Sequence, residues 1–133
     1  MQQNLLTVII PTFNDSQNIY RCLQSVFNQS FKDIEVIVIN DASTDNTLEI
    51  LETYRHTHHI KIINMPQNMG AGACRNRGIL EASSEYITFI DSDDWIDIGT
   101  YEKCFEQFKY NPDVIIYGLI YDYVEYNYRI KKY

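Results

Sequence analysis

The feature that most limits the fold of this chain is the regular alternation of apolar runs with helix-like segments. Continuous β-branched and apolar runs occupy residues 5–10, where Pro11 is expected to stop the strand, and residues 34–39, 60–63, 86–90 and 114–117. Helices are expected behind residues 14–16 and 43–45, which supply capping side chains, and over residues 73–81 and 101–108. This order predicts an α/β fold with a mostly parallel, Rossmann-like sheet and helices on both faces.

Size and composition narrow the class of protein further. A monomer of 15.7 kDa buries about 68% of the surface of its extended chain, so one core needs no disulfide or metal. The net charge of −7 argues against a nucleic-acid partner, which requires a basic stripe. No apolar run reaches the ~18–20 residues of a membrane span, and the first residues do not resemble a signal peptide. We therefore expect a cytoplasmic protein.

Polar residues follow three of the expected strands directly. Thr12, Asp41 and Asp91 each stand just past the end of a different strand. In parallel sheets, ligands bind outside the carboxyl ends of the strands, near the point where strand order reverses. The sequence therefore predicts a ligand site at this edge of the sheet.

The charge is concentrated in one segment. Residues 81–100 contain no Lys or Arg and carry the acidic residues Glu81, Glu85, Asp91, Asp93, Asp94 and Asp97. Two carboxylates separated by one residue at a strand end can turn toward one point, and Mg²⁺ or Mn²⁺ takes such oxygens together with substrate phosphates. Asp94 is either a further metal ligand or a cap, and the whole cluster could instead open a surface helix.

Asp41 and Arg75 each have both a functional and a structural interpretation. The carboxylate of Asp41 can accept a hydrogen bond from a ligand, or it can cap a helix that residues 43–45 already cap. Residues 70–78 match neither a dinucleotide fingerprint, because Arg75 stands where a glycine is required, nor a phosphate-binding loop. Arg75 can face a phosphate from the start of a helix, or form a surface salt bridge.

Taken together, four segments resemble the N-terminal half of family 2 glycosyltransferases, which have the GT-A fold. The segments occur in the same order and spacing, and they are VIIPTFN (8–14), VIVINDASTD (36–45), NMG (68–70) with ACRN (73–76), and FIDSDDW (89–95). The resemblance implies a nucleotide-diphosphate-sugar donor, most commonly linked to UDP. It also implies Mn²⁺ or Mg²⁺ as cofactor.

The resemblance also implies roles for individual residues. Pro11, Thr12 and Phe13 would line the base with help from Asp15, and Asp41 would hydrogen-bond the base. Arg75 would lie near the pyrophosphate or ribose. Asp91 would face the ribose and Asp93 would coordinate the metal, with Asp91 and Asp94 as further metal ligands. The implied nucleotide site is Pro11, Thr12, Phe13, Asp15, Asp41, Arg75, Asp91, Ser92 and Asp93.

The implied reaction is inverting transfer of the sugar to a glycan or lipid-linked acceptor, as in polysaccharide and cell-envelope synthesis. No segment after Tyr101 matches the general-base motif of the family, and the available carboxylates of Asp113, Asp122 and Glu125 are not distinguishable. We expect residues 1–120 to form a partial GT-A donor-binding domain. Residues 121–133, rich in tyrosine, are expected to start a truncated acceptor-binding half, in which residues 121–128 form an edge strand or hairpin arm.

Two other function classes stay open. One is a nucleotide-sugar-binding module that performs no transfer, and the other is a nucleotidyltransferase, although residues 11–21 contain none of the glycine that such enzymes use there. The tyrosine-rich end offers a surface for a second copy of the chain or for a missing half. A lipid-linked acceptor would bring the protein to the inner face of the membrane.

Overall fold

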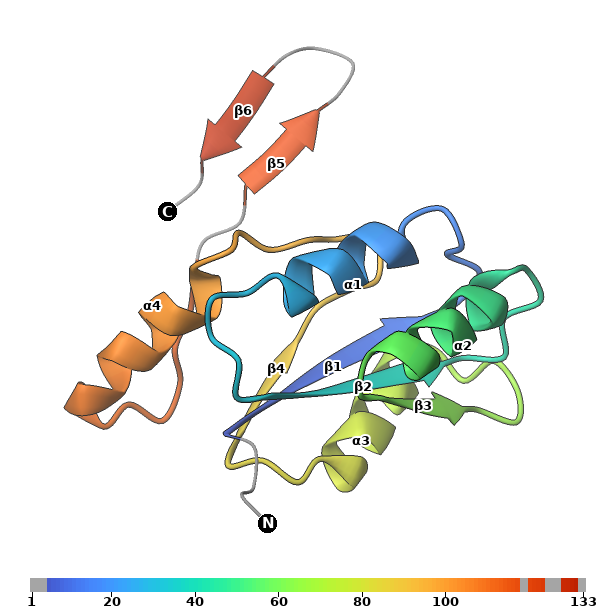
Figure 1. Ribbon diagram of the computed structural model, residues 1–133, viewed down its shortest axis with the longest axis horizontal. Helices are drawn as coiled ribbons and strands as arrows, with labels where there is room; N and C mark the ends of the chain where they lie inside the picture. The colour runs from blue at the N-terminus through green and yellow to red at the C-terminus, as the bar shows by residue number, and fades with distance from the viewer. Residues whose placement is uncertain (1–4, 118–119, 124–127, 132–133) are drawn as a thin grey trace.

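The computed structural model describes residues 5–117, 120–123 and 128–131. Strands and helices alternate through the first four strands, as the sequence predicts (Figure 1). The elements are β1 (Leu6–Thr12), α1 (Ile19–Phe27), β2 (Ile34–Asn40), α2 (Thr47–Thr57), β3 (Ile60–Asn64), α3 (Ala71–Glu81), β4 (Tyr86–Phe89), α4 (Thr100–Glu106), a 3-10 helix η1 (Gln107–Tyr110), β5 (Ile120–Tyr123) and β6 (Tyr128–Lys131).

The first four strands form one parallel sheet in the order β3-β2-β1-β4. β1 lies between β2 and β4, and Val8 is in register with Val36 on one side and Thr88 on the other. All seven residues of β1 are buried, which explains its continuous apolar sequence. Strand order reverses at β1, because β2 and then β3 are added on one side of β1, whereas β4 pairs with its other side.

Helices cover both faces of this sheet, as predicted. On one face, Val8 and Ile10 of β1 pack with Leu23 of α1, Leu51 of α2 and Tyr101 of α4 in the larger core cluster. On the other face, Ile9, Ile37 and Ile39 pack with Cys74 of α3 in a smaller cluster. Figure 1 shows α1 and α2 on one side of the strands and α3 on the opposite side.

β1 does not stop at Pro11, contrary to the sequence-based expectation, but runs on to Thr12. The carbonyl of Ile9 accepts the N–H of Ile90, whereas the carbonyl of Thr12 accepts the N–H of Asp41, so alternate residues of β1 face β4 and β2. Pro11 faces the β4 side beyond the last residue of that strand. Its missing N–H therefore costs no hydrogen bond within the sheet.

The prediction of a fifth strand over residues 114–117 is wrong. These residues adopt no strand, and the side chains of Val114 and Ile116 are 74% and 91% exposed. An apolar run forms a strand only where a neighbour can pair with it, and the described residues supply none here. After it, β5 and β6 pair as an antiparallel hairpin in which Tyr123 is in register with Tyr128.

The hairpin agrees with the expected hairpin arm over residues 121–128, of which residues 124–127 lie outside the described residues. Residues 1–4, on which the expectation of no signal peptide depends, also lie outside the described residues, as do residues 132–133. Over the part of the chain that the structure describes, no helix has both the length and the apolar character to cross a bilayer.

Candidate functional site

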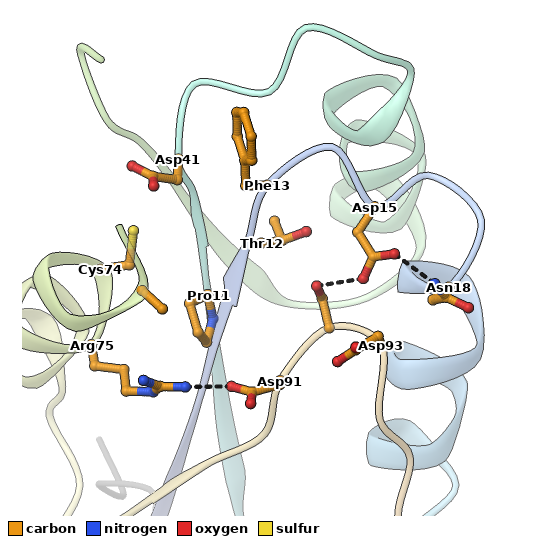
Figure 2. A pocket seen from close by; sticks show the side chains of 12 residues that line it. Pro11, Thr12, Phe13, Asp15, Asn18, Asp41, Cys74, Arg75, Asp91 and Asp93 are labelled. Carbon is orange, nitrogen blue, oxygen red and sulfur yellow. Dashed lines mark hydrogen bonds and ion pairs between the residues drawn. The ribbon is translucent and has the colours of Figure 1, made fainter. Parts of the chain in front are cut away.

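A cleft of about 390 Å³ opens at the carboxyl ends of β1, β2 and β4, beside the N-terminal half of α3 (Figure 2). All nine residues of the nucleotide site predicted from the sequence line it, so the fold brings together segments that are up to 80 residues apart. The lining residues are Pro11, Thr12, Phe13, Asp15, Asn18, Asp41, Ala71, Cys74, Arg75, Asp91, Ser92 and Asp93. Asp94, the remaining candidate metal ligand, is outside this lining.

The loops after β1 and β2 are joined by hydrogen bonds across the cleft rim. The side-chain oxygen of Asn14 accepts the N–H of Thr44 at 2.7 Å, and the N–H of Asn14 donates to Ser43 Oγ at 3.0 Å. Asn14 and Ala42 adopt left-handed conformations with φ of 47° and 59°. The expected capping of α1 by residues 14–16 is therefore wrong, because adjacent strands place these polar groups opposite the neighbouring loop.

Asp45 accepts hydrogen bonds both at the start of α2 and from the loop that follows β1. Its carboxylate accepts the N–H of Thr47 at 2.9 Å at the start of α2, in line with the expected cap, and the N–H of Ser16 at 3.1 Å from the other loop. Burial acts to raise the pKa of Asp45, but the hydrogen bonds from Thr47 and Ser16 outweigh it and lower the pKa to about 2. The charged carboxylate thus holds the two loops together.

Asp41 fixes the loop that leads into α3. Its two carboxylate oxygens accept the N–H groups of Met69 and Gly70, each at 2.8 Å, and its side chain is almost fully buried. Gly70 has a φ of 89°, a conformation that glycine adopts without strain. The carboxylate also lines the cleft, and each oxygen retains a further lone pair for a ligand.

Thr12 and Cys74 form part of the inner wall of the cleft. The hydroxyl of Thr12 is buried and has no hydrogen-bond partner among the described residues. Burial and then the neighbouring charge of Asp41 raise the pKa of the Cys74 thiol to about 11, so it stays protonated at neutral pH. A buried hydroxyl without a partner is costly, and a ligand donor or acceptor in the cleft would satisfy it.

Arg75 and Asp91 form an ion pair across the cleft, with Arg75 Nη2 at 2.5 Å from Asp91 Oδ1 (Figure 2). The two side chains are 35% and 52% exposed, so water screens the pair and its net contribution to stability is small. The salt bridge that the sequence left as an alternative is thus present, and it lies at the predicted site. A phosphate group entering the cleft would find the guanidinium within reach.

Residues 90–99, which connect β4 to α4, form an acidic loop that contains Asp91, Asp93, Asp94 and Asp97. Among the described residues, no ion pair reaches the carboxylate of Asp93. Burial raises the pKa of Asp94, and the charges of Asp93 and Asp91 raise it further, although Arg21 acts in the opposite direction. Within the described ranges, no group of three or more His, Cys, Asp and Glu side chains is arranged to hold a metal by itself.

The acidic loop is also held from behind, by Asp15, which the sequence analysis placed in the nucleotide site, and by Asn18, which it missed. Ser92 Oγ donates to Asp15 Oδ2 at 2.6 Å, and Asn18 Nδ2 donates to Asp15 Oδ1 at 2.7 Å. The buried side chain of Ser92 thus ties the loop to the segment before α1, and Figure 2 shows Asp15 turned toward Asn18 on the same side of the cleft. Asp15 therefore has both oxygens bonded within the protein.

α1 makes further bonds to the main chain of the same loop. Cys22 Sγ lies 3.6 Å from the carbonyl oxygen of Asp91, and Ser25 Oγ accepts the N–H of Ile96 at 3.2 Å. Burial and then the surrounding carboxylates raise the pKa of Cys22 to about 12, so the thiol remains a donor. In the sequence, Asn18, Arg21 and Ser25 recur at a spacing of three to four residues, which marks one side of α1 but does not identify its partner.

Comparison with known proteins agrees with the fold. The profile described as "Glycosyl transferase family 2" matches residues 7–133. Glycosyltransferase GlyA of Streptococcus pneumoniae is 36% identical over 112 residues, which are 84% of this chain and 16% of that protein. The uncharacterized glycosyltransferase YibD of Escherichia coli is 39% identical over 74% of this chain and 29% of its own length. The chain spans less than half the length of these curated relatives.

Solved structures give the same result. The structure of Staphylococcus aureus TarS 1-349 in complex with UDP has a TM-score of 0.75 and 35% identity, over 80% of this chain and 32% of that one. The mannosyltransferase PcManGT from Pyrobaculum calidifontis, in complex with GDP-Man and Mn²⁺, has a TM-score of 0.66 and 25% identity over 71% of this chain and 29% of that one. The predicted GT-A fold is confirmed, and the chain belongs to glycosyl transferase family 2.

Proposed function

We propose that the chain binds a nucleotide-diphosphate-sugar, linked to UDP, and supplies the donor site of a glycosyltransferase that acts with Mn²⁺ or Mg²⁺. The observation that carries this proposal is the cleft itself, where the free carboxylate of Asp93, the guanidinium of Arg75 and the buried hydroxyl of Thr12 line one cavity. Similarity to TarS, which is solved with UDP and with UDP-GlcNAc, supports the choice of nucleotide.

The residues present fit a divalent cation. Mn²⁺ and Mg²⁺ are held by one or two carboxylates together with substrate phosphates, so the lack of a complete protein cage is no obstacle. Asp93 would hold the ion with Asp91 as the second ligand, and Asp94, the residue after Asp93, is a further candidate ligand. When bound, such an ion supplies Lewis-acid neutralisation of the charge on the leaving diphosphate.

The protein's own groups would bind and orient the donor. Phe13, whose side chain is 47% exposed, and Asp41 would contact the base at the β1 and β2 side of the cleft. Arg75 would donate to the diphosphate or ribose, exchanging part of its ion pair with Asp91 for a bond to the ligand. Transfer breaks the bond from the anomeric carbon to the diphosphate, so a cation placed there stabilises the charge that develops.

The acceptor side of the reaction is a separate proposal. An acceptor hydroxyl would attack with inversion, and a carboxylate would take its proton. We assign no general base, and we propose a glycan or lipid-linked acceptor with the protein in the cytoplasm, at the inner membrane face when the acceptor is lipid-linked. Among the described residues, those that line the cleft lie between positions 11 and 93, which supports a donor-binding part within residues 1–120, with residues 121–133 starting the acceptor-binding half.

Nucleotide-dependent thermal stabilisation of the 133-residue chain tests the donor site. We expect UDP with Mn²⁺ to raise Tm by several degrees, since a ligand at about 100 times its Kd stabilises the fold by roughly 2.7 kcal/mol. GDP with Mn²⁺ should raise it less. Asp93→Asn should abolish the part of the shift that depends on Mn²⁺.

Asp113→Asn is the matched control, because it removes an equal charge from an exposed carboxylate outside the cleft. It should respond to UDP and Mn²⁺ as the wild type does. An unchanged Tm with every nucleotide would refute the donor site. Stabilisation without release of UDP from UDP-sugars, in the presence of glycan and lipid-linked acceptors, would instead favour a binding module.

A further inference from the structure

The guanidinium of Arg21 lies between the acidic loop and Trp95, which is the single tryptophan of the chain. Its Nη2 donates to the carbonyl oxygen of Asp93 at 3.1 Å, and its Cζ lies 4.0 Å from the centre of the Trp95 ring. Nη2 also approaches Asn18 Oδ1 at 3.5 Å. A planar guanidinium that stacks on a ring and bonds to a carbonyl is fixed in two directions at once.

Arg21 binds the main chain of the loop and leaves the carboxylates free. Among the described residues its guanidinium forms no ion pair, so the carboxylate of Asp93 keeps its charge and its lone pairs for a ligand. A direct Arg21–Asp93 ion pair would compete with a cation for the same oxygens. The bond to the carbonyl avoids that competition while it holds the residue in place.

The contacts made by Arg21 complete a series along one side of α1. Cys22 contacts the carbonyl of Asp91 and Asp15 holds Ser92, so the loop before Asp93 is fixed independently of Arg21. Between Ser92 and Ile96, Arg21 supplies the bond at Asp93 and the stack on Trp95. Loss of Arg21 would therefore release Asp93 selectively, while the base and ribose side of the cleft keeps its contacts.

We propose that Arg21 is a positioning residue for Asp93, holding its main chain so that its carboxylate meets the divalent cation bound to the donor diphosphate. This inference rests on the proposed function, since it concerns the cation–diphosphate part of the same site. Residues that orient a metal ligand from behind alter metal affinity about 10- to 100-fold when they are removed. A merely structural arginine would alter Tm and leave the dependence on the cation unchanged.

UDP titrations followed by the fluorescence of Trp95 test the proposal in the full 133-residue chain. For Arg21→Ala, we expect the Kd of UDP in saturating Mn²⁺ to rise about 10- to 100-fold, and the Kd of UDP without metal to stay within about twofold. Arg21→Lys should fall between Arg21→Ala and the wild type, because lysine keeps the charge but lacks the planar stack. The emission of unliganded Trp95 should also shift in Arg21→Ala.

Arg55→Ala is the matched control. Arg55 is an exposed arginine on α2 that pairs with Glu52 and is not among the residues lining the cleft, so its loss changes the net charge equally. We expect it to bind UDP with Mn²⁺ as the wild type does. If Arg21→Ala does not melt cooperatively, the comparison of Arg21→Lys with Arg55→Lys gives the same test.

Three results with the variants would overturn the proposal. They are unchanged Mn²⁺-dependent affinity in both Arg21 variants, an equal loss of affinity with and without Mn²⁺, and an equal loss in the Arg55 control. A wild-type chain that binds UDP equally well with and without Mn²⁺ would also overturn it, while nucleotide binding would stand. A wild-type chain that binds no nucleotide would instead refute the proposed function.

Discussion

Gly78→Ala tests how closely α3 must approach β1 for the fold to form. A Cβ at position 78 would overlap Ile9 Cγ2 and lie 3.1 Å from Ile9 Cδ1, well inside the ~3.5–4.0 Å of a favourable carbon contact. Ile9 is fully buried in β1, between β2 and β4, so its side chain cannot turn into solvent. Overpacking costs about 1–3 kcal/mol, and an overlap this severe falls in the upper part of that range, at about 2–3 kcal/mol. Alanine favours the helix by about 1 kcal/mol, so we expect a net loss of about 1–2 kcal/mol.

The assay is thermal and urea unfolding of the wild type and the variant, with Gly72→Ala as the matched control on the same helix. Gly78→Ala should lower Tm by roughly 4–8 °C. A Cβ at Gly72 meets no atom within 4 Å, so that variant should be neutral or slightly more stable. Arg75 and Cys74 stand one turn earlier on α3, so a displaced helix should also weaken UDP binding.

A double-mutant cycle with Ile9→Ala identifies the cause. Removing the side-chain atoms that the new Cβ would strike should make Gly78→Ala neutral or stabilising in that background. The coupling energy between the two positions should therefore be about 2 kcal/mol. An equal cost of Gly78→Ala in both backgrounds, or a rise in Tm from the single substitution, would refute the packing argument.

Three further predictions concern charge, loop anchoring and the central strand. Asp45→Asn should lower the free energy of unfolding by its full amount above pH 4, and the difference from the wild type should shrink as the pH falls toward 2. The reason is that the pKa of Asp45 is about 2 in the folded protein but 3.8 ordinarily, so the wild type loses this stabilisation as the carboxylate is protonated; melting curves at several pH values measure the difference. Asp41→Asn should weaken UDP binding with and without Mn²⁺, since an amide cannot accept both the Met69 and Gly70 N–H groups; an unchanged Kd in calorimetry would limit Asp41 to another role. Val38→Asp should abolish cooperative unfolding in circular dichroism, because it buries an unpaired charge in β2, where Val38 is fully buried.

The sequence predicted the position of the cleft because parallel strands align their carboxyl ends. Thr12, Asp41 and Asp91 follow different strands, and any parallel pairing of those strands brings them to one edge. The boundaries of α1, α2 and β2 also follow from local periodicity. These features depend on short stretches of chain and on the handedness of crossovers, which are both visible without a structure.

Features that depend on a distant partner were not predictable. Residues 114–117 have the composition of a strand, but their conformation depends on whether a neighbouring strand is present. Arg21 is indistinguishable from any polar residue on an exposed helix face until β4 docks on β1 and places Trp95 and the Asp93 carbonyl beside it. Asn14 likewise resembles a helix cap, and only the adjacency of β1 and β2 assigns it to the neighbouring loop.

The ties between α1 and the loop after β4 determine when the cleft can form during synthesis of the chain. The strands β1, β2 and β3 can pair as soon as residue 64 is available, but Asp15 and Arg21 must wait for Ser92, Asp93 and Trp95. Contacts between residues so far apart in sequence form late, because closing the long loop between them first lowers the conformational entropy of the chain. A nascent chain that ends before β4 therefore has part of its sheet but lacks one wall of the cleft, so a ligand of the cleft cannot assist the first steps of its folding.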